Sequence, residues 1–319
     1  MTTIVGTSTL LAVSDLTVRF QLPQATVHAV SGLGLTVAPG ELLAVVGESG
    51  CGKSVLAHAL LGLLPANATV TGEAVLHGGD APVDLLSAGE RTLARAVRGR
   101  RIGLVPQSPA TALTPVRTGR HLLEETLRAH GRARADAEAV AAGVGLARAD
   151  LDLYPHELSG GMAQRLATAL ALAPDPPLLL ADEPTSGLDR PLVDATLELL
   201  RRRCDSGAAV ILITHDLAAA QRVADTVAVM YASRIVEHRP AGDFFTGPRH
   251  PYAHALLDAL PDRAFTPIPG HPPMLTDLPA GCAFAPRCPR AGQDCDAQPG
   301  LDPDERGRLA CHHPIGDHR

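Results

Sequence analysis

One eight-residue segment constrains the fold of this chain more than any other feature. Gly47-Glu-Ser-Gly-Cys-Gly-Lys-Ser54 matches the pattern G-x-x-x-x-G-K-[ST] at every specified position. It follows the apolar run Leu42–Val46, which is typical of a buried parallel strand. It precedes a predicted helix from about Lys53 to Leu64, which Pro65 would end. This strand–loop–helix order is that of a phosphate-binding loop in an α/β domain.

The residues of this loop have separate predicted roles. Glycines let backbone N–H groups curl around the β- and γ-phosphates of ATP, and the following helix N-terminus adds positive potential. Lys53, the only lysine of the chain, would contact the β/γ-oxygens, and Ser54 would offer its hydroxyl to Mg²⁺. Cys51 stands at a variable position of the pattern, so we assign it no redox role. The predicted phosphate-binding residues are Gly47, Glu48, Ser49, Gly50, Cys51, Gly52, Lys53 and Ser54.

A second apolar run ends in two carboxylates. Leu178–Ala181 is a predicted buried strand, and Asp182 and Glu183 follow it directly. Asp182 would hold Mg²⁺ through water, and Glu183 would point to the other side and polarise the attacking water. An acidic pair at a strand end often only caps a turn. Together with the phosphate loop, it indicates nucleotide hydrolysis.

The remaining periodicity predicts strands alternating with helices, hence a parallel sheet covered on both faces. The segment Glu90–Arg101 reads as an Arg-rich helix with a solvated face. Other predicted strands lie at 16–20, 33–37, 102–105 and 210–213, a β-rich excursion at 70–86, and helices at 122–146 and 162–173.

Composition excludes several classes of protein. The net charge of −6 gives no basic face for nucleic acid. Residues 1–13 lack the charged and apolar parts of a signal peptide, and no apolar run approaches the roughly 20 residues that span a bilayer. We therefore expect a cytosolic chain that reaches a membrane only through partners. Six cysteines in the cytosol favour metal or cluster chemistry over disulfides.

The composition and periodicity of the sequence change after about Phe245. Prolines cluster there, apolar periodicity weakens, and four of the six cysteines lie beyond Gly281. We predict an ATP-binding domain at residues 1–245 and a small, irregular Cys/Pro-rich C-terminal module at 246–319.

The segment Leu158-Ser-Gly-Gly-Met162, followed by Gln164-Arg165, resembles the LSGGQ-type signature of ABC ATPases. The resemblance implies a P-loop ABC ATPase domain with a parallel-sheet core, an antiparallel β-subdomain and a helical subdomain at about 108–173. It implies that Ser159, Gly160 and Gly161 contact the γ-phosphate of ATP held by a partner subunit, for which exposed N–H groups at a helix start are suited.

Three further elements, at Gln107, Asp189 and His215, match the family in order along the chain. Gln107 resembles the glutamine that touches Mg²⁺ and water, and Asp189 lies in a segment that resembles the D-loop at the dimer interface. His215 resembles the switch histidine that contacts the γ-phosphate. Phe20 resembles the aromatic residue that stacks on adenine, although a core role fits its strand position equally well.

The tail resembles that of oligopeptide/dipeptide/nickel importer ATPases. The matching segments are 250–261, 268–273 and 281–295, and the likeness covers about Leu16 to His312. The four tail cysteines, Cys282, Cys288, Cys295 and Cys311, suit zinc or an iron–sulfur cluster. The resemblance implies a [4Fe-4S] cluster, with Zn²⁺ and free thiols as the alternatives. Cys204 reads as an ordinary buried thiol.

The resemblance implies an ATPase that energises import of di- or oligopeptides from the cytoplasmic face of the membrane. Its partners would be two permease subunits, a second ATPase subunit and, indirectly, an extracytoplasmic binding protein. Import of nickel or a metal–opine complex is an alternative, because the ATPase never touches the substrate. An ABC ATPase of DNA repair or translation is disfavoured by the single ATPase unit and the net charge. The sequence departs from the family pattern at Ser108, Ala112, Thr114 and Ala163, and the first three of these positions lie near the expected contact with the permease.

Overall fold

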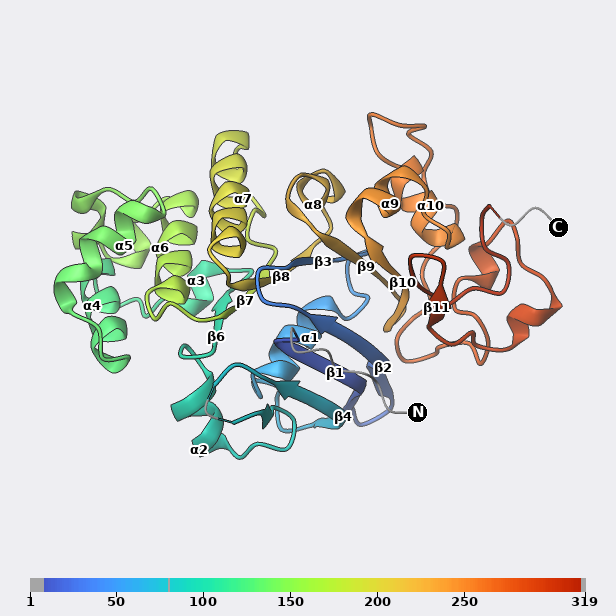
Figure 1. Ribbon diagram of the computed structural model, residues 1–319, viewed down its shortest axis with the longest axis horizontal. Coiled ribbons are helices and arrows are strands. Elements are labelled where there is room, and N and C mark those ends of the chain that lie inside the picture. The colour runs from blue at the N-terminus through green and yellow to red at the C-terminus, as the bar shows by residue number, and fades with distance from the viewer. Residues whose placement is uncertain (1–8, 80, 317–319) are drawn as a thin grey trace. The chain divides into compact units, whose positions relative to one another are not determined.

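The computed structural model of the chain describes residues 9–79 and 81–316. The chain divides into two compact units that are interleaved in sequence (Figure 1). The first unit consists mainly of Ala38–Leu42 and Ala88–Ile213. The second consists of Leu11–Val37, Leu43–Ser87 and the chain from Thr214 onward. Each unit has its own sheet strands and its own buried core.

The first unit contains three parallel strands, β6 (Ile102–Val105), β7 (Leu178–Asp182) and β8 (Ala209–Thr214). Nearly every residue of β7 and β8 is fully buried, as expected for aliphatic strands covered on both faces. All three strands were predicted, and two of them extend one residue or more beyond the predicted bounds. In register, Val105 pairs with Ala181, so β6 and β7 end at the same edge.

Ten helical segments complete the described part of the first unit. Three of them, α4, α5 and α6, pack side by side around a leucine-rich core (Figure 1). Leu123, Leu127 and Leu166 are fully buried in this core. The segments are α2 (Glu90–Thr92), η1 (Leu93–Val97), α3 (Pro109–Ala112), α4 (Gly119–Ala129), η2 (Arg134–Asp136), α5 (Ala137–Gly143), η3 (Arg148–Asp152), η4 (Pro155–Glu157), α6 (Gly160–Leu172) and α7 (Arg190–Asp205).

Two helix predictions in this unit were wrong in detail. The predicted helix 122–146 is broken at Gly131, whose φ of 74° is left-handed, and the Arg132 N–H closes α4 by donating to Leu127 O. The predicted helix 90–101 becomes a short α-turn and a π-turn that stop at Val97. There the extended Arg98 folds back and pairs with Glu90 at 2.6 Å.

The second unit contains two groups of strands. An antiparallel sheet has the order β2-β1-β4-β5, formed by β1 (Leu11–Gln21), β2 (Thr26–Val37), β4 (Ala68–Leu76) and β5 (Val83–Asp84). This matches the predicted antiparallel β-subdomain. The other group consists of β3 (Leu42–Val46), β9 (Thr226–Tyr231), β10 (Arg234–Pro240), β12 (Gly307–Leu309) and β11 (Asp302–Asp304).

The alternation of strands and helices predicted a parallel sheet, and this second group is parallel only in part. Strands β3 and β9 are parallel, but β9 and β10 pair antiparallel, because only the two-residue turn Ala232-Ser233 joins them. Both turn residues have positive φ, as tight hairpins require. Strands β12 and β11 continue the antiparallel pairing from the tail.

Helix α1 (Lys53–Leu60) ends four residues before the predicted limit, at the left-handed Gly62. The tail carries more regular structure than its proline content suggested. Its described helical segments are α10 (Pro251–Asp258), η5 (Ala285–Arg287) and η6 (Gln293–Asp296), and two helices precede it, α8 (Leu217–Val223) and α9 (Ala241–Thr246).

Aromatic side chains join the tail to the core of the second unit. Phe284 of the tail is only 2% exposed, and its ring centroid lies 5.4 Å from those of Tyr231 and Tyr252. Tyr231 ends β9, and Tyr252 lies in α10. The aromatic residues are few in this chain, so three of them in one cluster make a large share of the local apolar contact.

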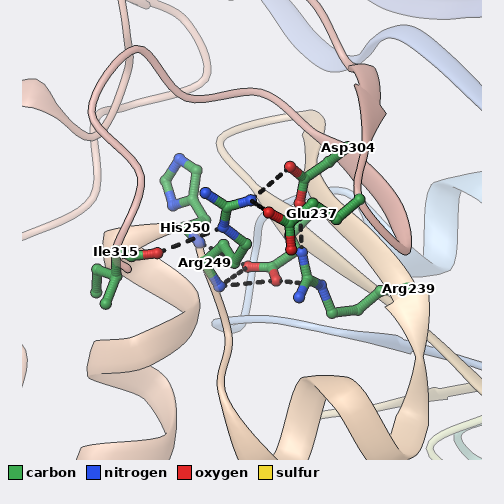
Figure 2. A network of polar contacts seen from close by, with 7 residues as sticks. Glu237, Arg239, Arg249, His250, Asp304 and Ile315 are labelled. Carbon is green, nitrogen blue, oxygen red and sulfur yellow. Dashed lines mark hydrogen bonds and ion pairs between the residues drawn. The ribbon is translucent and has the colours of Figure 1, made fainter. Parts of the chain in front are cut away.

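A buried charge network also joins the tail to β10 (Figure 2). The carboxylate of Glu237, fully buried on β10, accepts the backbone N–H groups of Arg249 and His250 at 2.9 and 2.8 Å. It also forms an ion pair with Arg239 at 2.7 Å. Asp304 of β11 pairs with both Arg239 and Arg249, at 2.8 and 2.7 Å. Each buried charge therefore has an opposite partner, without which burial would be costly.

We predict that Phe284→Ala lowers the free energy of unfolding by about 3–5 kcal/mol, because it removes a large buried side chain from a packed cluster. Denaturant titration of the purified chain measures this change. The matched control is Phe265→Ala, since Phe265 is 70% exposed. Equal, small effects of both substitutions would contradict the packing of the tail in this core.

Candidate functional site

The predicted site residues are divided between the two units. The phosphate loop, Phe20, His215 and the four tail cysteines belong to the second unit. Gln107, the acidic pair 182–183, the signature 159–161 and Asp189 belong to the first.

The phosphate loop approaches neighbouring backbone so closely that two of its glycines cannot be replaced. Gly47 has a φ of 151°, and a Cβ there would lie 2.1 Å from the carbonyl oxygen of Met230 on β9. Gly52 has a φ of 109°, and a Cβ there would lie 2.0 Å from the carbonyl oxygen of Ala29 on β2. Both glycines therefore serve conformation and packing together. The two glycines that the sequence pattern specifies are required here because they lie against the backbone of β9 and β2.

Lys53 opens α1 directly after this loop and is 6% exposed. Its Nζ donates to the carbonyl oxygens of Gly47 and Glu48 at 2.8 and 2.9 Å, so the ammonium group is held by the loop itself. Ser54 follows as the second residue of the helix. Burial raises the pKa of the neighbouring Cys51 thiol, which disfavours the thiolate.

Glu48 of the loop is held by two tail residues that the sequence reasoning missed. Its backbone N–H donates to Tyr252 Oη at 2.9 Å. Its carboxylate accepts Nη1 and Nη2 of Arg287 at 2.9 and 3.2 Å. These partners lie 204 and 239 residues away along the chain, so no spacing pattern points to them. Both lie inside the tail segments that carry the family resemblance, which was the one available signal.

The acidic pair lies at the carboxyl end of β7. Asp182 is its last residue and is buried, and Glu183 is buried directly after it. Glu183 has a left-handed φ of 47°, an uncommon conformation for a residue with a side chain. Its N–H donates to Ile213 O at 2.8 Å, which fixes this turn to β8. Such enforced backbone strain concentrates at functional sites.

Gln107 follows β6 by two residues and is exposed. Because β6 and β7 are parallel neighbours, Gln107 and the acidic pair leave the sheet at the same edge. This placement agrees with a shared role for these polar groups at the strand ends.

The signature segment forms the start of α6. Ser159 caps this helix, with its hydroxyl oxygen accepting the Met162 N–H at 3.3 Å. Gly160 is exposed, and a Cβ there would have no heavy atom within 4 Å. A Cβ at Gly161 would instead lie 2.5 Å from Leu192 Cδ1 of α7. One glycine thus leaves the helix start open, and the other permits close packing of α6 on α7.

Two predicted site residues lie beside helix caps. Asp189 caps α7, since its carboxylate accepts the Leu192 N–H at 3.2 Å. His215 is exposed and continues the chain from β8, and the next residue, Asp216, caps α8 through the Ala219 N–H at 3.0 Å. Phe20 is half-buried on β1, opposite Val27 and Ala68, so both roles considered for it stay open.

The four tail cysteines lie in the part of the second unit that follows Gly281. Cys282 N–H donates to Cys295 O at 2.9 Å, and the Arg290 N–H points to Cys288 Sγ at 3.4 Å. Burial raises the pKa of Cys311 to about 12, and the other three thiols add to the shift. Among residues 9–79 and 81–316, no group of His, Cys, Asp or Glu is arranged to hold a metal ion. Cys204 is buried, as predicted.

No helix in the described part of the chain is long and apolar enough to cross a membrane. Two family models match the sequence. The model described as "ABC transporter" matches residues 30–186, and the one described as "Oligopeptide/dipeptide transporter, C-terminal region" matches residues 236–295. The second match covers much of the C-terminal segment in which prolines cluster and apolar periodicity weakens.

Relatives match along nearly the whole chain. The oligopeptide transport ATP-binding protein OppD of Salmonella typhimurium is 41% identical over 96% of this chain and 94% of its own length. The probable D,D-dipeptide transport ATP-binding protein DdpD of Escherichia coli is 38% identical over 97% and 98%.

Solved structures agree on the fold. A dimeric, post-hydrolysis state of the ATP-binding cassette MJ0796 bound to ADP and Pi matches with a TM-score of 0.65 and 24% identity, over 72% of this chain and 98% of that one. A structure described as the ATP-binding subunit of an ABC transporter matches with a TM-score of 0.61 and 26% identity, over 74% and 92%. The mixed α/β fold, the two matching family models and the full-length relatives agree: the chain belongs to the ATP-binding subunits of the oligopeptide/dipeptide ABC transporters, which are ATPases.

Proposed function

We propose that this chain hydrolyses ATP to drive import of di- or oligopeptides through a membrane permease. The observation that carries the proposal is the loop at residues 47–54. Its glycines at 47 and 52 leave no room for a side chain, its lysine is buried, and a helix follows it, as expected of a site that binds phosphate. The names of relatives that transport oligopeptides and D,D-dipeptides support the substrate class. Import of nickel or a metal–opine complex is the alternative, to be decided on the assembled transporter.

In the proposed mechanism, Lys53 exchanges the carbonyl oxygens of Gly47 and Glu48 for phosphate oxygens when Mg·ATP enters. The exchange keeps the ammonium group hydrogen-bonded before and after binding, so a buried charge is never left without a partner. Ser54, Asp182 and Gln107 are the proposed Mg²⁺-side ligands, with Asp182 acting through water.

Glu183 is the proposed group that polarises the attacking water. Its carboxylate lies one residue beyond Asp182 and is held in an uncommon backbone conformation at the strand end. His215 is proposed to contact the γ-phosphate, and Phe20 to stack on adenine. These roles follow the family pattern at matching positions.

We propose that the signature segment acts on the ATP of a partner ATPase subunit, identical or related. Ser159 and Gly160 are exposed at the start of α6, where N–H groups and the helix dipole favour an anion. Asp189, exposed at the start of α7, would lie at the same interface. Two permease subunits, and indirectly an extracytoplasmic binding protein, complete the assembly at the cytoplasmic face of the membrane. ATP would supply work through its different affinities for the open and closed dimers.

We also propose that the tail cysteines, Cys282, Cys288, Cys295 and Cys311, hold a [4Fe-4S] cluster, with Zn²⁺ as the alternative. The donor set supports this, since four thiols of one module are the usual ligands of such a cluster. The N–H that points to Cys288 Sγ also suits a bound thiolate. Among the described residues, the thiols are not arranged to hold a metal ion. Binding of a cluster would therefore require the four sulfur atoms to move closer together. The domain boundary near residue 245 is part of this proposal.

Glu183→Gln should lower ATP turnover of the assembled transporter about a hundredfold or more while leaving ATP binding unchanged, because only the water-polarising charge is lost. Steady-state phosphate release and equilibrium ATP binding measure the two effects. The control is Glu198→Gln, on an exposed carboxylate of α7. Turnover within a few fold of the unsubstituted protein would rule out this role for Glu183.

Lys53→Ala should weaken ATP binding itself, by roughly a hundredfold if the lost contact is a charge-assisted one to phosphate. Equilibrium binding of labelled ATP to the full chain tests it, with thermal unfolding as the check on folding. Unchanged affinity in a folded variant would mean that residues 47–54 are not the phosphate site.

Anaerobically purified protein should contain about four iron and four sulfide per chain. Metal analysis and the visible absorption spectrum measure this, and Cys288→Ser should remove most of the iron. The control is Cys204→Ser, which lies outside the tail. Stoichiometric zinc without iron would contradict the cluster and support Zn²⁺ as the bound metal. Protein that contains neither metal would contradict both and mean that the four thiols are free.

A further inference from the structure

The tail and the phosphate loop meet at one residue, Glu48. Three independent contacts fix it: its N–H to Tyr252, its carboxylate to Arg287, and its carbonyl oxygen to Lys53 at 2.9 Å. The first two partners belong to the C-terminal tail, and the third is the lysine of the phosphate pattern. The same residue therefore touches both the tail and the group that would hold phosphate.

Arg287 is built into its position to an unusual degree. It is only 8% exposed, and four of its N–H groups have acceptors. Nε donates to Pro269 O at 2.8 Å, Nη1 to Tyr231 Oη at 3.2 Å, and the two terminal nitrogens form the fork on Glu48. Its guanidinium carbon lies 5.7 and 5.8 Å from the ring centroids of Tyr231 and Phe284. Contacts other than Glu48 therefore already orient the guanidinium group toward the loop.

The geometry explains what this contact does to the loop. Backbone N–H groups can bind phosphate only if the loop holds its left-handed shape, and Glu48 lies between Gly47 and the exposed Ser49 and Gly50. The hydrogen bond from the Glu48 N–H to Tyr252 holds the peptide between residues 47 and 48, and the paired fork holds the Glu48 side chain. A buried arginine without the carboxylate would be left with unpaired charge, so each partner requires the other.

We propose that Arg287 and Tyr252 are positioning residues for ATP: through Glu48, the C-terminal tail preorganises the phosphate loop and so sets nucleotide affinity. This inference rests on the proposed function, since it takes residues 47–54 as the phosphate site. It adds that the tail is part of the nucleotide site in energetic terms, although it lies more than two hundred residues away in sequence.

Equilibrium ATP binding and turnover of full-length variants test the proposal. Arg287→Gln and Glu48→Gln should each raise the Kd and the KM for ATP about tenfold, the loss expected for one charge-assisted contact, with kcat within about twofold. Tyr252→Phe should raise both by only about threefold, because it removes one neutral hydrogen bond to the Glu48 N–H. Arg287→Lys should recover part of the affinity, because it keeps the charge without the fork. The double variant Arg287→Gln/Glu48→Gln should be no weaker than either single one, since both remove one shared interaction.

The matched control is Arg306→Gln, which removes an exposed tail arginine paired with Asp243 and should leave the KM for ATP unchanged. A merely structural role for Arg287 predicts a lower melting temperature in both Arg287→Gln and its double variant with no change in Kd. That result, or full additivity of the two single effects, would overturn the proposal. Lys53→Ala distinguishes failure of the proposed phosphate site from failure of the tail proposal. If Lys53→Ala binds ATP normally, residues 47–54 are not the phosphate site. If Lys53→Ala loses affinity but the Arg287 variants bind ATP normally, only the proposal about the tail is wrong.

Discussion

A loop that binds phosphate through its backbone must keep that backbone in a shape that ordinary residues avoid. In this chain the shape is enforced by close approach, with Gly47 against Met230 of β9 and Gly52 against Ala29 of β2. Any side chain at either glycine would collide with a carbonyl group of a buried strand. The position of β9 therefore decides the shape of the loop, and whatever holds β9 holds the loop as well.

The tail of the chain holds β9. The buried Glu237 network ties β10, the partner of β9, to residues 249–250 and to Asp304 (Figure 2). Tyr231 at the end of β9 packs on Tyr252 and Phe284, with the Tyr252 ring 4.4 Å away. Arg287 then reaches from this aromatic cluster to Glu48. A segment with the composition of an irregular appendage is thus packed into the core that supports the nucleotide loop.

The sequence predicted those features that depend on short segments. The loop, the polar residues Gln107 and Asp182 at strand ends, and the glycines at the start of a helix near residue 160 are local patterns, and the structure places each at the expected point of its element. Family resemblance extended this reading to the tail. The four cysteines of the tail can be counted in the sequence, but the arrangement of their sulfurs cannot be predicted from it, because that arrangement depends on loops without periodicity.

The features that sequence missed depend on long-range contact or on small backbone details. The pairing of Arg287 with Glu48 spans 239 residues, and nothing in either local sequence indicates it. The break after α4 depends on one left-handed glycine, Gly131, within an otherwise helical composition. The antiparallel edge at β10 depends on the turn at 232–233, where neither residue is a typical turn former for positive φ.

The most direct test of this account is an experimental structure of the full chain with ATP and Mg²⁺, in a Glu183→Gln background to preserve the nucleotide. In that structure, Lys53 Nζ should have left the carbonyl oxygens of Gly47 and Glu48 for phosphate oxygens. The Arg287 fork and the Tyr252 hydrogen bond to Glu48 should still be in place. Nucleotide bound away from residues 47–54, or a loop that binds phosphate only after Arg287 has released Glu48, would contradict it.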